Sequence, residues 1–266
     1  MDPRPINFLF KNYVVPEILD TIKELSSYIQ TTENFLQTLY MNKLEEFVNF
    51  EKKLGVDELP DGTSVQEFFD LHYRAWPEGR FADLLRLSSA VSIYAFIEFH
   101  LMELCNLIRR KDIQCSISHI KGQNYIDKAK VYISEVLCAT FPSNSKEWEE
   151  IQIYRRIRNC IVHNGGEIKE NTADRRAIEQ FIKTNEGLVS ITDDRIFLTK
   201  GFCEKMLDTT QGFFNLLGES LVDFVNQNES NLENLAQDFG EYYLGRPIRM
   251  IYAPIPERFI QDKKQS

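Results

Sequence analysis

The densest group of residues with chemical potential lies at residues 154–168, which read YRRIRNCIVHNGGEI. Arg155, Arg156 and Arg158 fall within four consecutive positions, and His163 follows them closely. An arginine guanidinium offers paired N–H donors that match the oxygens of a phosphate group. A histidine can both accept and donate a proton near neutral pH. Together these residue types indicate acid–base chemistry at a phosphate.

The spacing of these residues suits one helix, in which each residue turns by about 100°. Asn159 and His163 are four positions apart and therefore share a face. Arg156 is seven positions before His163 and falls on the same stripe. Arg158 is five positions before His163, so it points about 140° away in an ideal helix. Only its long side chain, or a distorted helix end, would bring it beside His163.

His163 is expected in the last turn of this helix, because Gly165 and Gly166 follow it. Free carbonyls and the helix dipole there favour a protonated imidazole, whereas neighbouring arginines disfavour it. Such opposed effects suit a histidine that both gains and loses a proton. The same residues are also ordinary chemistry for ending a helix, and the spacing leaves both interpretations open.

Another helix, the most apolar of the chain, carries a carboxylate that needs explaining. Between Ala90 and Ile108 the sequence is hydrophobic on almost every side of a helix, which predicts the central buried helix. Glu98 lies among its apolar residues, and a buried carboxylate is costly unless a cation pairs with it. A cationic partner from another helix is expected, unless Glu98 reaches water at the edge of the face. His100 is expected to be a core or boundary histidine.

The remaining pattern predicts a mainly all-α protein, a helical bundle with one small β-hairpin near residues 188–199. Apolar residues recur three and four apart from Val15 to about Leu54, in one long helix or two. Two short β-branched runs flank a turn at residues 192–194 and predict the hairpin. We expect an N-terminal helical region at 1–79, a helical domain at 80–226 and a C-terminal tail at 227–266. The Tyr- and Pro-rich segment of this tail either docks a partner or packs on its own domain.

The net charge and the residue types of the chain narrow the classes of protein to which it can belong. The 266 residues carry a formal charge of −9, which excludes a globally basic nucleic-acid binder but allows a local basic cleft. The start of the chain has no signal-peptide pattern, and the clearest uncharged apolar run is shorter than the roughly 18 residues of a membrane span. A cytoplasmic protein without membrane contact is therefore expected. The sequence shows no clustered Cys/His ligand set and no phosphate-binding glycine loop, so no metal or cofactor is expected.

The segment RNCIVH resembles the Arg-x4–6-His signature of the HEPN superfamily, helical domains that include many ribonucleases. In that signature a polar residue, often Asn, directly follows the Arg, as Asn159 does here. A buried helix with a Glu, a motif helix ending in HNGG, and a hairpin before a long final helix extend the likeness over roughly residues 81–226.

This resemblance implies a metal-independent endoribonuclease that leaves a 2′,3′-cyclic phosphate, and possible roles as a toxin or antiviral effector. Arg158 would steady the phosphate charge, His163 would move the proton, Asn159 would position the pair, and Glu98 would support them. Two subunits of the family commonly place their motifs face to face, so a homodimer with a shared cleft is implied, with RNA as substrate. An antitoxin or other partner protein would fit a toxin.

Two alternatives stay open. Arg155 and Arg156 are either general phosphate contacts or plain surface charge. Some HEPN members are inactive and only bind partners, so a non-catalytic interaction or RNA-binding module is the second hypothesis. Members regulated by modification of a tyrosine carry it two residues after the His, where this chain has Gly165.

Overall fold

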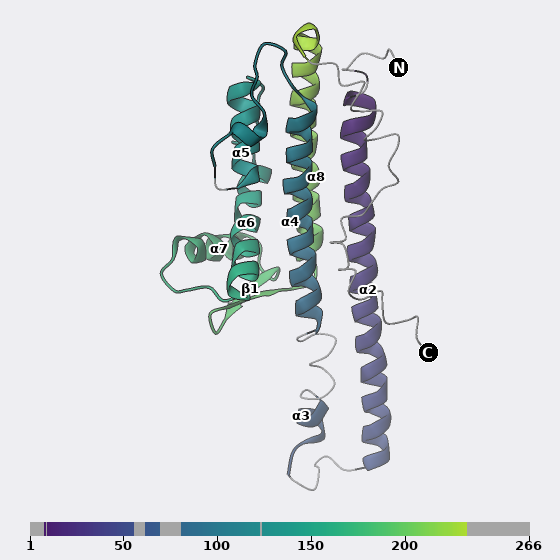
Figure 1. Cartoon of the computed structure of the whole chain (residues 1–266). Coiled ribbons are helices and arrows are strands. Elements are labelled where there is room, and N and C mark those ends of the chain that lie inside the picture. Colours follow the sequence, from purple (N-terminus) through teal and green to yellow (C-terminus); the bar gives the residue numbers. More distant parts are fainter. Residues whose placement is uncertain (1–7, 9, 56–61, 70–80, 123, 233–266) are drawn as a thin grey trace, which may run out of the picture.

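The computed structural model describes residues 8, 10–55, 62–69, 81–122 and 124–232. It confirms the predicted fold class, because the chain forms a mainly helical bundle with one two-stranded antiparallel sheet (Figure 1). The elements are α2 (Val15–Leu54), α3 (Val65–Phe69), α4 (Phe81–Leu107), α5 (Tyr125–Val131), α6 (Lys146–Asn164), α7 (Ala173–Thr184), β1 (Val189–Thr192), β2 (Arg195–Leu198) and α8 (Phe202–Asn228). Short π-helical turns at Phe10–Val14 and Tyr132–Val136 lead into α2 and extend α5.

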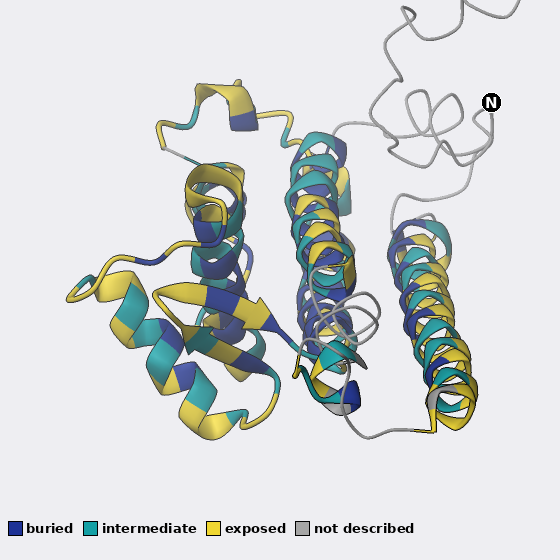
Figure 2. Cartoon of the chain, turned by 90° about the horizontal axis from the view of Figure 1, so that it is seen from below, coloured by how far each residue is buried: buried dark blue, intermediate teal, exposed yellow. Residues whose placement is uncertain are grey.

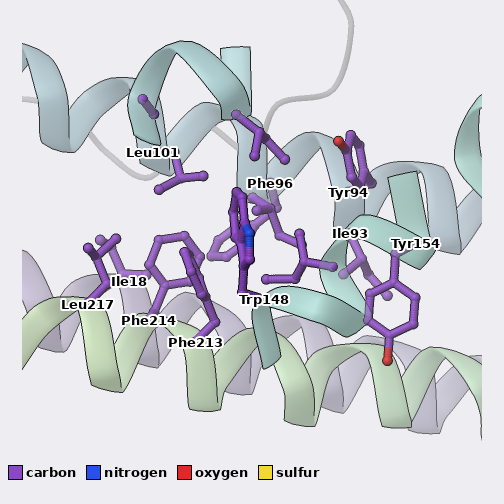
Figure 3. Close-up of a cluster of buried hydrophobic side chains, with 14 of the residues drawn as sticks. Ile18, Ile93, Tyr94, Phe96, Leu101, Trp148, Tyr154, Phe213, Phe214 and Leu217 are labelled. Atoms are coloured by element: carbon purple, nitrogen blue, oxygen red, sulfur yellow. The ribbon is translucent and has the colours of Figure 1, made fainter. Parts of the chain in front are cut away.

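The most apolar helix, α4, lies at the centre of the bundle, as the sequence predicted. It packs against α2, α5, α6 and α8 (Figure 1). Tyr94, Ile97 and Leu101 of α4 are almost completely buried. The aromatic side chains of Trp148, Phe213 and Phe214 fill the space between α4, α6 and α8 (Figure 3). Because α4 is apolar on almost every side, it packs against helices on several sides.

By length and composition alone, α4 is also long and apolar enough to cross a membrane, and it is the one such helix in the described part of the chain. The expectation from the sequence considered only the uncharged run before Glu98, which is shorter than the helix. This property is weak evidence for a membrane span, because the core helix of a soluble protein shares it. Of its most apolar stretch, 39% is buried in the bundle.

The N-terminal helix α2 is a single helix of 40 residues. It lies beside α8 and α4, and its far end extends beyond α4 (Figure 1). Ile18, Ile22 and Ile29 are buried in the same core cluster as the residues of α4 and α8. Figure 2 shows α2 on one flank of the bundle and α7 with the hairpin on the other.

The hairpin forms at the predicted place and pairs Val189 with Leu198 and Thr192 with Arg195. Asp193 and Asp194 form its turn with φ angles of 49° and 59°. Successive left-handed residues are typical of the tight turns that match the twist of a hairpin, and aspartate tolerates them better than most residues.

Candidate functional site

The motif helix α6 begins and ends where local sequence signals place it. The Ser145 side chain accepts a hydrogen bond from the backbone N–H of Trp148 at 3.1 Å and caps its first turn. Gly165 has a φ of 62° and its N–H bonds back to the carbonyl of Cys160, so the helix stops directly after Asn164. Ile157 and Cys160 are buried, which anchors one side of α6 in the core.

Arg158 lies on the boundary between the core and the solvent. One guanidinium nitrogen, Nη1, donates to Oδ1 of Asn159 at 3.1 Å. The guanidinium carbon lies 5.8 Å from the centre of the Tyr94 ring of α4. The Nε atom is buried and has no hydrogen-bond partner among the described residues. Arg158 therefore connects the buried face of α4 to the exposed face of α6.

The described residues show no hydrogen bond between Arg158 and His163, in keeping with the direction that an ideal helix gives Arg158. The last turns of α6 are regular α-helix up to Asn164, so no distortion turns the residue toward His163. Instead, the long side chain reaches sideways to Asn159, which shares a face with His163 one turn further on. Both Asn159 and His163 are exposed, so a ligand can reach this face from the solvent.

Glu98 is half-buried on α4, one turn after Tyr94. Burial raises the pKa of its carboxyl group, and the positive charge of Arg158 opposes that rise. The sequence predicted a cationic partner for Glu98 or an edge position that reaches water, and the half-buried Glu98 has Arg158 of α6 as the cation that acts on its carboxyl group. Among the described residues, however, Glu98 and Arg158 form no direct ion pair, so the effect of Arg158 on Glu98 comes from its charge rather than from contact.

The other two arginines of the motif are engaged with carboxylates that sequence reasoning did not identify. Nη1 of Arg155 lies 3.1 Å from a carboxylate oxygen of Asp127 on α5. Arg156 forms an ion pair with Asp174 at the start of α7. A phosphate at either arginine would have to compete with its carboxylate partner. Of the three arginines, Arg158 alone is without a carboxylate ion pair in the described part of the chain.

Sequence reasoning also missed Tyr94, although a signal for it existed. Tyr94 and Glu98 are four positions apart on one helix, so they share a face. Had Arg158 been placed against Glu98, the tyrosine one turn earlier would have been its neighbour.

The described residues include no group of three or more His, Cys, Asp or Glu side chains arranged to hold a metal ion. The arrangement at the end of α6 offers a guanidinium, an amide and an imidazole, which can bind an anion and transfer a proton. Comparison of the chain with protein-family models finds no match. Comparison with curated proteins finds none either. Among solved structures, too, nothing matches.

Proposed function

We propose that this protein is a metal-independent endoribonuclease of the HEPN type that acts in the cytoplasm, as a toxin or an antiviral effector. The observation that carries the proposal is the placement of Arg158. It is held against α4 and bonded to Asn159 on the exposed face that also carries His163. A cation, an amide and an imidazole at one open helix end match the needs of RNA cleavage.

In the proposed reaction the ribose 2′-oxygen attacks the neighbouring phosphorus, and the bond from phosphorus to the 5′-oxygen breaks. The products are a 2′,3′-cyclic phosphate and a free 5′-hydroxyl. Arg158 would stabilise the extra negative charge on the phosphate oxygens in the transition state. His163 would take the proton of the 2′-hydroxyl or give one to the leaving 5′-oxygen. Asn159 would keep Arg158 at the face of His163.

The proposal includes a homodimer, because one histidine cannot be both the acid and the base in a single step. An exposed part of α4 supports a second copy. Leu84 is 59% exposed, Ala95 is exposed, and Val91 and Met102 are only half-buried. These residues lie on the side of α4 that continues from Tyr94 and Glu98. A second subunit that covers this apolar surface would bring its own α6 close to the first.

The test is cleavage of mixed RNA and tRNA by purified protein in the presence of EDTA. Wild type is expected to produce ends with 2′,3′-cyclic phosphates. Arg158→Ala and His163→Ala are each expected to lower the rate by about a hundredfold or more, because each removes a group that acts in the transition state.

A matched control is Arg176→Ala, which removes an exposed arginine of α7 and should leave the rate unchanged. The ribonuclease proposal fails if wild type cleaves no better than His163→Ala. Loss of cleavage in EDTA that returns with a divalent cation would instead indicate a metal-dependent enzyme.

A second candidate function, a non-catalytic interaction module, is favoured by the surface of α2. Tyr28 and Phe35 are seven positions apart, so they share one face, and both are 53% exposed. Exposed aromatic residues on one helix face are typical of protein-binding surfaces. A complex that is lost in Tyr28→Ser/Phe35→Ser but kept in Arg158→Ala and His163→Ala would support this candidate.

A further inference from the structure

Tyr94 has a buried hydroxyl group without a hydrogen-bond partner among the described residues. Only 1% of the residue is exposed. Two other buried tyrosines use their hydroxyl groups: Tyr132 donates to the carbonyl of Ile108 at 3.0 Å, and the oxygen of Tyr154 lies 3.1 Å from Oγ1 of Thr209. A buried hydroxyl without a partner is unfavourable, so the hydroxyl group itself explains nothing about this position, and a role of Tyr94 has to be sought in its ring.

The surroundings of Tyr94 point to α6. Figure 3 shows Tyr94 apart from the aromatic cluster of Trp148 and Phe213. The guanidinium carbon of Arg158 lies 5.8 Å from the centre of the Tyr94 ring. A cation over an aromatic face is attracted by the electron density of the ring, and the attraction grows where water is excluded. The ring of Tyr94 thus forms a cation–π contact with the Arg158 guanidinium.

Burial keeps the hydroxyl group of Tyr94 protonated. Burial raises the pKa of Tyr94, and the negative charge of Glu98 raises it further. Arg155 and Arg158 oppose this rise, and Asp127 adds to it. Tyr94 is therefore a neutral side chain at physiological pH, and the contact that it makes with Arg158 is through its ring face.

Arg158 is constrained from two directions. The Tyr94 ring lies against its guanidinium, and Oδ1 of Asn159 accepts from Nη1. Its Nε is buried and, like the hydroxyl of Tyr94, has no acceptor among the described residues. A free arginine side chain samples many rotamers, whereas this one is oriented before any ligand arrives. Orientation of a reacting or charge-stabilising group in advance is a large part of catalytic efficiency.

We propose that Tyr94 is a positioning residue, which holds the Arg158 guanidinium against α4 so that its remaining donors face the RNA phosphate. This inference rests on the proposed ribonuclease function. It assigns the essential contribution to the aromatic ring rather than to the hydroxyl group, because the ring makes the contact that the structure shows.

The experiment measures kcat/KM for RNA cleavage in Tyr94→Leu and Tyr94→Phe, each with and without Arg158→Ala. Tyr94→Leu removes the ring face and should lower kcat/KM by roughly tenfold or more. Tyr94→Phe keeps the ring face and should stay within about twofold of wild type. In the Arg158→Ala background, Tyr94→Leu should cause no further loss, because the residue that it positions is already absent.

Phe96→Leu is the matched control, since it also removes a buried ring from α4 but on the side that contacts Phe214. It should lower the thermal unfolding temperature as Tyr94→Leu does and leave kcat/KM near that of wild type. If Tyr94→Leu lowers kcat/KM by the same factor with and without Arg158, its role is general packing and the inference is overturned.

A second readout follows Arg158 itself. The signal of its buried Nε–H in ¹⁵N NMR should move strongly in Tyr94→Leu and little in Tyr94→Phe, because the ring current of the aromatic face is lost only in the first. An unchanged signal in Tyr94→Leu overturns the inference. Wild type that fails to cleave RNA overturns the proposed function and this role with it, whereas active wild type with equally active Tyr94→Leu overturns only the role of Tyr94.

Discussion

The three arginines of α6 differ in whether the structure gives them a carboxylate partner. Arg155 and Arg156 are bound to Asp127 and Asp174, so their charges are largely compensated. Arg158 reaches the exposed Asn159 without a carboxylate ion pair of its own. Three arginines that look equivalent in the sequence are thus chemically different, and only Arg158 combines the lack of a carboxylate ion pair with a hydrogen bond to Asn159.

His100 shows how burial changes a residue that titrates. Its ring lies 4.2 Å from that of Phe96 and 5.0 Å from that of Phe99, measured between centres. Nδ1 is buried and has no hydrogen-bond partner among the described residues. Burial lowers the pKa of His100 to about 4. The histidine is therefore neutral in the folded protein near neutral pH and lies at the boundary of the core, one of the two positions that the sequence predicted.

We expect His100 to make the protein less stable as the pH falls from about 6.5 toward 4. In this window the unfolded chain binds a proton at His100 and the folded protein does not, so acid favours unfolding. Between pH 7 and pH 5 the contribution is about 2 kcal/mol. Urea unfolding at the two pH values measures the free energy of unfolding. Its decrease from pH 7 to pH 5 should be about 2 kcal/mol smaller in His100→Leu than in wild type.

Phe214→Leu is the control for this experiment, because it changes a neighbour of His100 without removing a titrating group. It should lower the free energy of unfolding by the same amount at both pH values. Equal pH dependence in wild type and His100→Leu would contradict the prediction.

At the scale of elements, the end of α6 decides where His163 lies. Gly165 adopts the left-handed conformation with a φ of 62°, and Gly166 follows with a φ of 90°. The chain then turns at once into a short bridge between Glu167 and Arg195, which ties the helix end to the hairpin. His163 is consequently the last-turn residue of a helix whose end is held in place.

Gly165→Ala should lower the free energy of unfolding by about 1 kcal/mol, since alanine is disfavoured in the left-handed region. A Cβ atom at this position would meet nothing within 4 Å, so the cost comes from the backbone alone. Chemical denaturation of the purified variant measures it.

Gly165→Asn is the informative comparison for that variant, because asparagine tolerates left-handed φ angles better than alanine. The free energy of unfolding of Gly165→Asn should lie between those of wild type and Gly165→Ala. An alanine variant as stable as wild type would mean that the helix end relaxes into another conformation.

At the scale of the whole molecule, α2 and the rest of the bundle share one core. Ile18 and Ile22 are buried with residues of α4 and α8. Gly218 of α8 lies so close to α2 that a Cβ atom there would come within 2.9 Å of Val15. A buried ion pair adds to this packing: Glu33 accepts two hydrogen bonds of 2.7 Å from Arg86, and their side chains are only 6% and 16% exposed.

Glu33→Gln should lower the free energy of unfolding by about 3 kcal/mol, because it leaves the charge of Arg86 buried without its partner. The free energy of unfolding should fall less in the double variant Glu33→Leu/Arg86→Met than in Glu33→Gln, since neither charge then remains buried. Denaturant unfolding of both variants, followed by circular dichroism, measures this difference.

The exposed pair of Lys23 and Asp20 on the same helix is the matched comparison. Asp20→Asn should change the free energy of unfolding by less than about 1 kcal/mol, as is usual for surface pairs. A loss in Glu33→Gln no larger than in Asp20→Asn would show that the buried pair does not hold α2 to α4.

The sequence by itself determined the features that depend on neighbouring residues. Gly165 ends α6 because a left-handed turn is a local preference, whereas the sequence left both Ser143 and Ser145 open as its start and the structure has Ser145 as the cap. The hairpin turn at Asp193 and Asp194 follows from the same kind of local preference. The periodicity of apolar residues also predicted the all-helical bundle and its central helix, since each helix must bury its apolar side.

Only the tertiary structure decided which polar groups meet. Arg155 pairs with an aspartate 28 positions away and Arg156 with one 18 positions away. Arg158 lies against Tyr94 of another helix. Such partners depend on how helices rotate and cross, which the packing of the whole core sets and no local spacing encodes. The sequence could therefore indicate a cationic helix end with a histidine, but only the fold showed that Arg155 and Arg156 have carboxylate partners and that Arg158 lies against Tyr94.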